Sequence, residues 1–168
     1  MSRFYLAYGS NLSVGQMLRR CPDAVYAGTA VIKGYRLMFR GSKTGSYLTI
    51  EKKKGRSVPV LVWKVSAEDE EALDLYEGFP AFYRKEDMAV ELQSLSDGAP
   101  MGTIQAFVYL MDESRPLGKP SNQYLGVCLE GYRRFGFDAA ILERAYREST
   151  GRRQMPQTEE QRMIGGYR

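Results

Sequence analysis

The sequence FYLAYGSNL, Phe4 to Leu12, passes from an apolar segment directly into a small polar turn. Its first five residues carry the aromatic and aliphatic side chains that are typical of a buried strand, whereas Gly9, Ser10 and Asn11 favour a turn. An amphipathic segment, Val14 to Arg20, follows at once. The order predicts a strand, a tight turn and a short helix, and the rest of the chain is organised around this unit.

The turn itself has two interpretations. A turn at the start of a helix points unpaired backbone N–H groups outward, and these donors favour a bound anion. Gly9 would let such a ligand approach the backbone closely. Alternatively, Asn11 or Ser13 only caps the helix and Gly9 only turns the chain. The glycine pattern of a dinucleotide site and the Gly-Lys-Ser/Thr ending of a phosphate loop are both absent from the turn, so these two motifs are excluded.

The composition describes one domain. A chain of 168 residues, 43% of them hydrophobic, is long enough for one core and short for two domains. We expect the domain to span residues 1–150 and residues 151–168 to form a polar tail, mobile or loosely docked. The sequence has neither an apolar run of about 20 residues nor a signal-peptide pattern, so we expect a cytoplasmic protein without a membrane partner. Cys21 and Cys128 match no disulfide or metal-ligand spacing, and we expect reduced thiols.

The chain contains no histidine, which limits its chemistry. Ser-His-Asp and Cys-His catalysis and most transition-metal sites are removed together, so proton transfer must use carboxylates, Tyr, Lys or Cys. The net charge of +4 is small for a nucleic-acid-binding protein, and the basic residues are scattered. We expect neither a metal nor a nucleic-acid partner.

Strand signals outnumber helix signals. We expect a bent strand or a strand pair over Val25 to Arg40, strands over Phe82 to Leu92 and Gly102 to Met111, and a hairpin whose strands, Tyr47–Glu51 and Val58–Val65, flank a turn at Lys52-Lys53-Lys54-Gly55. The second hairpin strand is apolar on both faces, which places it deep in a sheet or a closed barrel.

Three helices have clear starts. Ser66, Ser121 and Asp138 are suitable N-cap residues, and Gly78 ends the first of these helices. Because strands dominate and two helices are gathered at the end of the chain, the order predicts an α+β domain rather than a doubly wound parallel sheet.

Glu77 is the most distinctive carboxylate. It ends an acidic helix, yet its immediate neighbours in Leu75-Tyr76-Glu77-Gly78-Phe79-Pro80 are apolar or aromatic. Burial among such groups raises a carboxyl pKa toward the range useful for a general base. The alternative is a surface glutamate in the last helical turn. Tyr83 and Tyr124 are further candidates, and the Tyr124 hydroxyl, in the first turn of its helix, would reach a pocket. With 12 tyrosines in the chain, a core position is the alternative for each.

Taken together, Tyr8-Gly9-Ser10-Asn11-Leu12, Glu77-Gly78, Tyr83 and Pro120-Ser121-Asn122-Gln123-Tyr124 resemble the γ-glutamylcyclotransferase family, which includes the AIG2-like proteins. The resemblance extends from Phe4 into the last helix. It implies an α+β fold, a small mixed β-barrel with flanking helices and a pocket at one end. It also implies that Gly9-Ser10-Asn11-Leu12 holds the α-carboxylate of a γ-glutamyl group and that Glu77 is the general acid/base. Tyr8, Tyr83 and Tyr124 would line this site.

The reaction implied by the resemblance needs no cofactor. The α-amine of a small-molecule γ-glutamyl substrate attacks its own γ-carbonyl, which gives 5-oxoproline and a free amine. The form with Asn11 resembles the γ-glutamyl amino acid or amine enzymes more than the glutathione-specific branch. For the leaving amine, we expect the loops Arg40–Gly45 and Met111–Lys119 to line its part of the pocket.

Three alternatives remain open: a noncatalytic module that binds a small carboxylate, the same chemistry on a larger γ-glutamyl-protected metabolite, and a basic nucleic-acid-binding domain. Oligomeric state is open as well.

Overall fold

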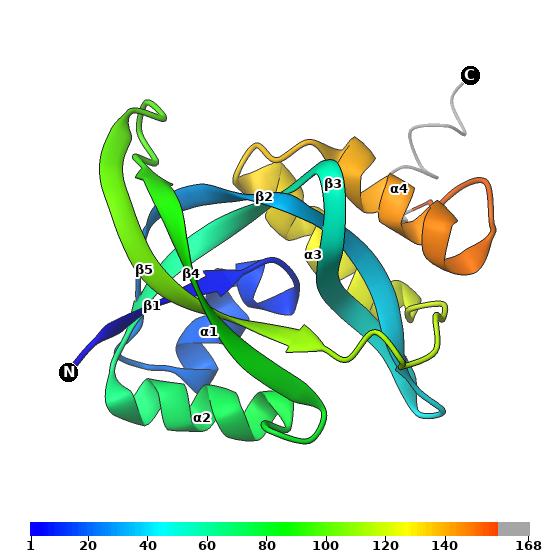
Figure 1. Ribbon diagram of the computed structural model, residues 1–168, viewed down its shortest axis with the longest axis horizontal. Coiled ribbons are helices and arrows are strands. Elements are labelled where there is room, and N and C mark those ends of the chain that lie inside the picture. The colour runs from blue at the N-terminus through cyan, green and yellow to red at the C-terminus, as the bar shows by residue number, and fades with distance from the viewer. Residues whose placement is uncertain (158–168) are drawn as a thin grey trace.

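Five strands and four helices make up the part of the chain that the computed structural model describes, residues 1–157 (Figure 1). The strands are β1 (Arg3–Ala7), β2 (Val25–Ser42), β3 (Gly45–Val65), β4 (Tyr83–Gln93) and β5 (Pro100–Met111). The helices are α1 (Val14–Arg20), α2 (Ala67–Glu77), α3 (Asn122–Arg134) and α4 (Ala139–Thr150), and a 3-10 turn, η1 (Ser10–Leu12), joins β1 to α1. The predicted α+β class is confirmed.

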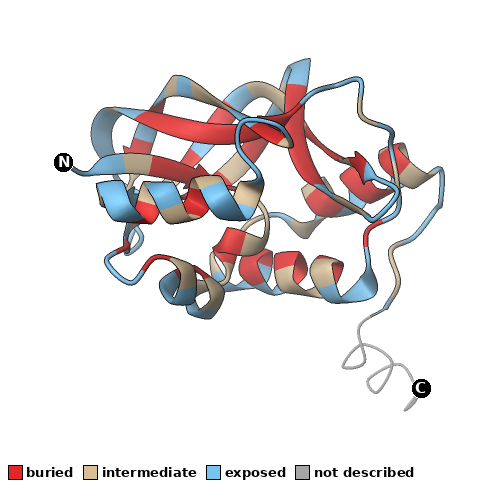
Figure 2. Cartoon of the chain, turned by 90° about the horizontal axis from the view of Figure 1, so that it is seen from below, coloured by how far each residue is buried: buried red, intermediate tan, exposed pale blue. Residues whose placement is uncertain are grey.

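The strands form one mixed sheet in the order β1-β3-β2-β4-β5, and this order closes on itself. Closure comes from β1, which pairs antiparallel with β3 and parallel with β5. The least extensive strand pairing lies between β2 and β4, which have a single pair of facing residues, Thr29 and Gln93. Helix α1 lies beside α2, and α3 beside α4 (Figure 1). In Figure 2 the buried residues concentrate on the sheet and on the helix faces turned toward it.

The expected hairpin between Tyr47 and Val65 is wrong. β3 is one long strand paired with β2, and the turn between these two strands lies between Ser42 and Gly45. Near the lysine-rich stretch the pairing jumps from Lys33 with Ser57 to Tyr35 with Lys52, so the lysines form an irregularity within a strand. A local reading of the sequence misses this because the partner of each half of β3 is β2 and not the other half. As expected, the stretch from Val58 to Val65 is largely buried on both faces.

β2 is the bent strand that the sequence allowed as one of two alternatives. Its pairing with β3 shifts register next to Gly28 and next to Gly34, the two glycines that interrupt the apolar pattern. Gly34 has a φ of 78°, a left-handed conformation that favours glycine. The strand therefore bends where the sequence supplies residues that allow it.

The predicted helix caps are confirmed. Ser66 accepts a hydrogen bond from the Asp69 N–H and the Asp69 carboxylate accepts one in return, which is a capping box. Gly78 ends α2 in the left-handed conformation. Ser121 and Asp138 cap α3 and α4 with their side chains. For α1 the cap is Ser13 and not Asn11.

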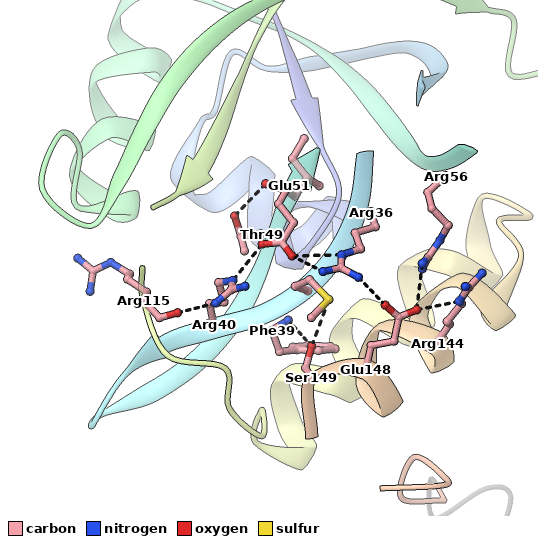
Figure 3. Close-up of polar contacts among 12 residues, drawn as sticks. Arg36, Phe39, Arg40, Thr49, Glu51, Arg56, Arg115, Arg144, Glu148 and Ser149 are labelled. Atoms are coloured by element: carbon pink, nitrogen blue, oxygen red, sulfur yellow. Dashed lines mark hydrogen bonds and ion pairs between the residues drawn. The ribbon is translucent and has the colours of Figure 1, made fainter. Parts of the chain in front are cut away.

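Helix α4 is held against β2 and β3 by a charged network, drawn in Figure 3. The carboxylate of Glu51, only 5% exposed, accepts hydrogen bonds from Arg36 and Arg40. Arg36 also donates to Glu148 of α4 at 3.0 Å. Beside this network the Ser149 hydroxyl accepts the Phe39 N–H at 2.8 Å, which ties α4 directly to the β2 backbone.

Three further expectations concern the tail, membrane-spanning helices and the two cysteines. Of the expected tail, residues 158–168 lie outside the described part of the chain, so its character there stays a prediction. No helix within residues 1–157 has both the length and the apolar character needed to cross a bilayer. Cys21 and Cys128 are both free thiols, and both are buried.

Candidate active site

A cavity of about 350 Å³ opens among the end of β1, the turn that follows it, the end of α2 and the start of α3. Seven of the eight residues predicted for the site line it: Tyr8, Gly9, Ser10, Asn11, Glu77, Tyr83 and Tyr124. These residues are spread over more than a hundred positions of the chain, and the fold brings them to one place.

Leu12, the eighth predicted residue, does not line the cavity. Its side chain is fully buried and packs against α3, where a Cβ built on Gly131 would lie 2.4 Å from the Leu12 Cβ. Leu12 therefore anchors the turn to the core instead of contacting a ligand. The sequence pattern could not separate these roles, because an apolar residue after a turn suits both.

This close contact gives the first testable prediction. Gly131→Ala should lower the free energy of unfolding by about 1–3 kcal/mol, because the new methyl group overlaps Leu12 in a packed core. Gly126→Ala is the matched control on the same helix, since a Cβ built there meets nothing within 4 Å. This variant should be neutral or should stabilise the protein by up to about 1 kcal/mol. Denaturant unfolding of both variants measures the difference, and equal stabilities would contradict the packing described here.

Asn11 holds the turn in place with every polar group of its side chain. Its Nδ2 donates to the Tyr5 hydroxyl at 3.0 Å and its Oδ1 accepts from Arg20, while its backbone carbonyl accepts from Trp63 Nε1 at 3.0 Å. The side chain is almost fully buried. Apart from the Ser10 hydroxyl, what the turn offers to the cavity is consequently its backbone. This includes the first N–H groups of η1, which have no backbone partner within the turn.

Gly9 is the residue of the turn whose backbone lies close to the Tyr124 hydroxyl. A Cβ built there would lie 3.0 Å from the Tyr124 hydroxyl, so a side chain at this position would press on Tyr124 and narrow the cavity. The glycine thus keeps the backbone of the turn open to the cavity.

The site tyrosines are fixed through their hydroxyls. Tyr8 donates to the Tyr109 carbonyl at 2.5 Å and Tyr83 donates to the Leu48 carbonyl at 2.8 Å, while the Tyr124 hydroxyl accepts the Leu48 N–H at 3.1 Å. Burial raises the pKa of Tyr8, Tyr83 and Tyr124 well above the usual value for tyrosine. These side chains therefore stay neutral at physiological pH and give the cavity a rigid wall.

Glu77 is the only carboxylate among the described residues that line the cavity. Burial raises its pKa from 4.5 to about 7, and the positive charge of Arg20 acts in the opposite direction. Tyr5 and Tyr8 lie near this carboxyl: burial is the largest cause that raises the pKa of both, and the Glu77 charge is the second. Glu77 is therefore near its midpoint between acid and base at neutral pH, which is the condition for exchanging protons with a ligand.

The physical cause of this pKa differs from the one that the sequence suggested. The neighbours of Glu77 in the chain, Leu75 and Tyr76, are 82% and 48% exposed and lie at the cavity mouth. Burial of the carboxyl depends instead on the tyrosines that other elements bring to the cavity. Glu77 is thus a desolvated carboxyl, as predicted, but the residues next to it in the sequence do not bury it.

Several residues of the site have no signal in the sequence. The cavity is also lined by Tyr5, Tyr47, Leu48, Tyr76, Phe82 and Tyr109. Arg20 lies behind this lining, where its guanidinium stacks 3.6 Å from the centre of the Tyr76 ring. Aromatic and basic residues are common along the chain, so nothing local distinguishes these from core or surface residues.

The expected contribution of two loops is wrong. Neither Arg40–Gly45 nor Met111–Lys119 lines the cavity. The second loop pairs instead with the end of β2: the Gly41 N–H donates to the Pro116 carbonyl and the Gly118 N–H to the Phe39 carbonyl, both at 3.1 Å. Tyr47 and Leu48, just after the first loop, face the cavity in its place.

Within residues 1–157, no three Cys, Asp or Glu side chains gather closely enough to hold a metal ion. The polar groups that line the cavity are hydroxyls, backbone groups, one amide and the Glu77 carboxyl. Such a set suits a small organic ligand with its own charged groups.

The chain is an α+β protein whose closed sheet carries a tyrosine-lined cavity with one carboxyl among its described lining residues. The comparisons with known proteins identify its family. The model of the family described as "Gamma-glutamyl cyclotransferase, AIG2-like" matches residues 5–127, and the chain belongs to this family. The resemblance predicted from the motifs is confirmed.

Solved structures agree with this assignment. One described as "Gamma-glutamyl cyclotransferase" is 26% identical, with a TM-score of 0.72 and 100% of each chain covered. An uncharacterized human protein, loc79017, is 27% identical, with a TM-score of 0.68 and 97% of each chain covered. YkqA from Bacillus subtilis shares the fold at 20% identity, with a TM-score of 0.68 over 88% of this chain and 54% of its own. A search of the curated proteins finds no match.

Proposed function

We propose that this protein is a cyclotransferase that converts a γ-glutamyl amide to 5-oxoproline and a free amine, with Glu77 as the general acid/base. One observation carries the proposal: a carboxyl with a pKa raised to about 7 by burial lines the same cavity as the backbone of the Gly9–Asn11 turn. Membership of the family supports it.

The turn is assigned to substrate binding. Its outward N–H groups would hold the α-carboxylate of the γ-glutamyl group, since Asn11 already uses its side chain to fix the turn. Around the turn, the tyrosine walls leave about 350 Å³, a volume suited to a compact ligand. A glutamyl chain held folded in that space has its α-amine close to its γ-carbonyl, and this proximity lowers the barrier to ring closure.

Glu77 is assigned to proton transfer. As a carboxylate it takes a proton from the α-ammonium, and the free amine attacks the γ-carbonyl carbon to form the new C–N bond. The old amide C–N bond then breaks, and the leaving nitrogen receives the protons that the attacking nitrogen has lost. No water is consumed and no covalent enzyme intermediate forms. Backbone N–H groups or a tyrosine hydroxyl would stabilise the oxyanion in between.

The test is a direct measurement of the products. The full-length protein is incubated with a panel of γ-glutamyl amino acids and γ-glutamyl amines, and 5-oxoproline and the released amine are quantified together. We expect equal amounts of the two products from at least one compound. Absence of 5-oxoproline across the panel, from protein shown to be folded, would contradict the proposal.

Arg20 gives a second prediction, on pH dependence. Because its charge lowers the pKa of Glu77, Arg20→Gln should raise that pKa further and move the acidic limb of kcat/KM to higher pH. Arg19→Gln is the control, since Arg19 is the neighbouring arginine of α1 and is exposed; its profile should match the wild type. An unchanged profile in the Arg20 variant would contradict the electrostatic link between Arg20 and Glu77.

A further inference from the structure

Helix α2, which ends at Glu77, has little apolar attachment to the rest of the fold. Along its eleven residues, all within the described part of the chain, the buried side chains are Asp69 and Leu73. Asp69 belongs to the capping box at the start of the helix, and Leu75 near its end is 82% exposed. Apolar burial therefore does little to fix the last turn of α2, and its polar contacts carry more of this role.

Asp74 provides the main polar contacts of this turn. Its Oδ1 accepts a hydrogen bond from the Tyr109 hydroxyl of β5 at 2.6 Å and lies 2.9 Å from the Lys85 Nζ of β4. Lys85 also donates to Glu70, one turn earlier on α2, at 3.1 Å. The side chains of Asp74 and Lys85 are 26% and 19% exposed, so salt screens this ion pair less than an exposed one. Two strands thus hold one side of α2 through charge-assisted hydrogen bonds.

Asp74 and Glu77 share this side of the helix. The i, i+3, i+4, i+7 spacing of a single helical face is followed by Glu70, Leu73, Asp74 and Glu77. Residues three apart on a helix are neighbours, with their Cβ atoms about 5–6 Å apart. A contact that fixes Asp74 therefore also fixes the turn that carries the Glu77 carboxyl.

Tyr109 connects Asp74 to the cavity. Tyr109 lines the cavity, and its backbone carbonyl accepts the Tyr8 hydroxyl at 2.5 Å, whereas Asp74 is not among the residues of the lining. Burial, and then the hydrogen bond to Asp74, raise the pKa of Tyr109 well above the usual value for tyrosine. The hydroxyl therefore stays protonated and remains the donor to Asp74.

The position of Glu77 depends on this preceding turn. Gly78 follows at once in the left-handed conformation that ends the helix, so the chain turns away directly after the carboxyl-bearing residue. Under the proposed function, the carboxyl must lie within hydrogen-bond reach of the substrate nitrogen. A misplacement of about 1 Å at such a site can lower the rate by up to about 10²-fold.

We propose that Asp74 is a positioning residue of the reaction: through Tyr109 and Lys85 it fixes the last turn of α2 to β5 and β4, and so holds the Glu77 carboxyl at the cavity. This inference rests on the proposed function and adds to it a residue that acts without contacting the substrate.

Two substitutions at Asp74 test the inference. Asp74→Ala removes the contacts to both strands, and we expect kcat for 5-oxoproline release, per folded protein, to fall by about 10- to 100-fold. KM should stay within about threefold of the wild-type value, because the turn assigned to binding is unaltered. Asp74→Asn keeps an Oδ1 that can accept from both partners, so its kcat should stay within about threefold of wild type. Circular dichroism measures the folded fraction of each variant.

Two further variants complete the experiment. Lys85→Met removes one partner of Asp74 from outside the cavity lining, and we expect kcat to fall by about tenfold with KM unchanged. Glu71→Ala removes an exposed acid of the same helix and should leave both constants unchanged. If Asp74→Ala did not fold, Lys85→Met would decide: wild-type kcat in that variant would overturn the inference, and so would a failure of both to fold, since the contact would then be structural.

The remaining outcomes separate this inference from the proposed function. Wild-type kcat in Asp74→Ala, or equal losses of kcat in the Ala and Asn variants, would overturn the positioning role while the wild type still released 5-oxoproline. A rise in KM as large as the fall in kcat would also overturn it, because the contact would then serve binding. Absence of 5-oxoproline release by the wild type across the whole substrate panel would overturn the proposed function and the inference with it.

Discussion

Glu77→Gln should reduce kcat/KM for 5-oxoproline formation by about 10²–10⁴-fold, the usual contribution of a positioned general acid/base. Glutamine keeps the shape of the side chain and still lines the cavity, but it cannot accept a proton from the substrate ammonium. The loss should appear mainly in kcat, since the turn that is assigned to binding is not altered. Steady-state kinetics with the best γ-glutamyl substrate measures the effect.

Glu77→Gln should lower activity but increase the free energy of unfolding, and the size of this increase depends on pH. Burial raises the pKa of Glu77 from 4.5 to about 7 in the folded protein, so the folded state favours the protonated form. The resulting stabilisation is complete below about pH 4.5 and is lost as the pH rises through 7. At pH 8 the wild type holds a partly buried carboxylate, and the neutral glutamine should increase the free energy of unfolding by about 1–3 kcal/mol.

Glu71→Gln is the matched control on the same helix. Glu71 is exposed, so its replacement should change neither activity nor the pH dependence of stability. Activity of Glu77→Gln within tenfold of wild type would contradict the assigned role. If Glu77→Gln instead lowered the free energy of unfolding at pH 8, that result would contradict the conclusion that the wild type holds a buried, ionised carboxylate at this pH.

Glu51→Gln should lower the free energy of unfolding by about 3 kcal/mol, near the lower end for breaking a buried ion pair. The Glu51 carboxylate is 5% exposed and lies 2.9 Å from Arg36 and 3.1 Å from Arg40. Glutamine removes the charged partner of Arg40, whose other acceptor among the described residues is the neutral Arg115 carbonyl, whereas Arg36 keeps the charged Glu148. Because Arg36 keeps its contact with Glu148, we expect a loss near the lower end of the range for a broken buried ion pair. Denaturant unfolding at neutral pH measures the change.

Glu86→Gln is the control for this network. Glu86 pairs with Arg84 at 2.9 Å, but the two side chains are 37% and 48% exposed, and such pairs contribute at most about 1 kcal/mol. If the Glu51 and Glu86 variants had equal stabilities, the network in Figure 3 would not be the anchor of α4 that its burial indicates.

The Glu51 network also supports the candidate site indirectly. Arg40 joins Glu51 to the backbone of Arg115, and the Arg115 guanidinium stacks on Phe82 at the cavity mouth. Loss of Glu51 should therefore weaken the support of Phe82. We expect the Glu51 variant to discriminate less between γ-glutamyl substrates with large and small leaving groups.

The sequence by itself determined the features that depend on neighbouring residues. Helix caps at Ser66 and Asp138 and the stop at Gly78 were predictable, because a cap is made within one helical turn. The strand and turn from Phe4 to Asn11 were predictable for the same reason. Glu77 was the candidate carboxyl and lies in the cavity lining, and the set of motifs indicated the family.

Only the tertiary structure decided which residues meet across the chain. The continuity of β3 depends on β2 as its partner, and the core position of Leu12 depends on Gly131, more than a hundred residues away. Likewise, burial raises the pKa of Glu77 in a cavity whose tyrosines come from other elements, and the Tyr47 ring meets Phe82 only in the folded chain. Burial and packing depend on three-dimensional neighbours, so no local pattern of residues specifies them.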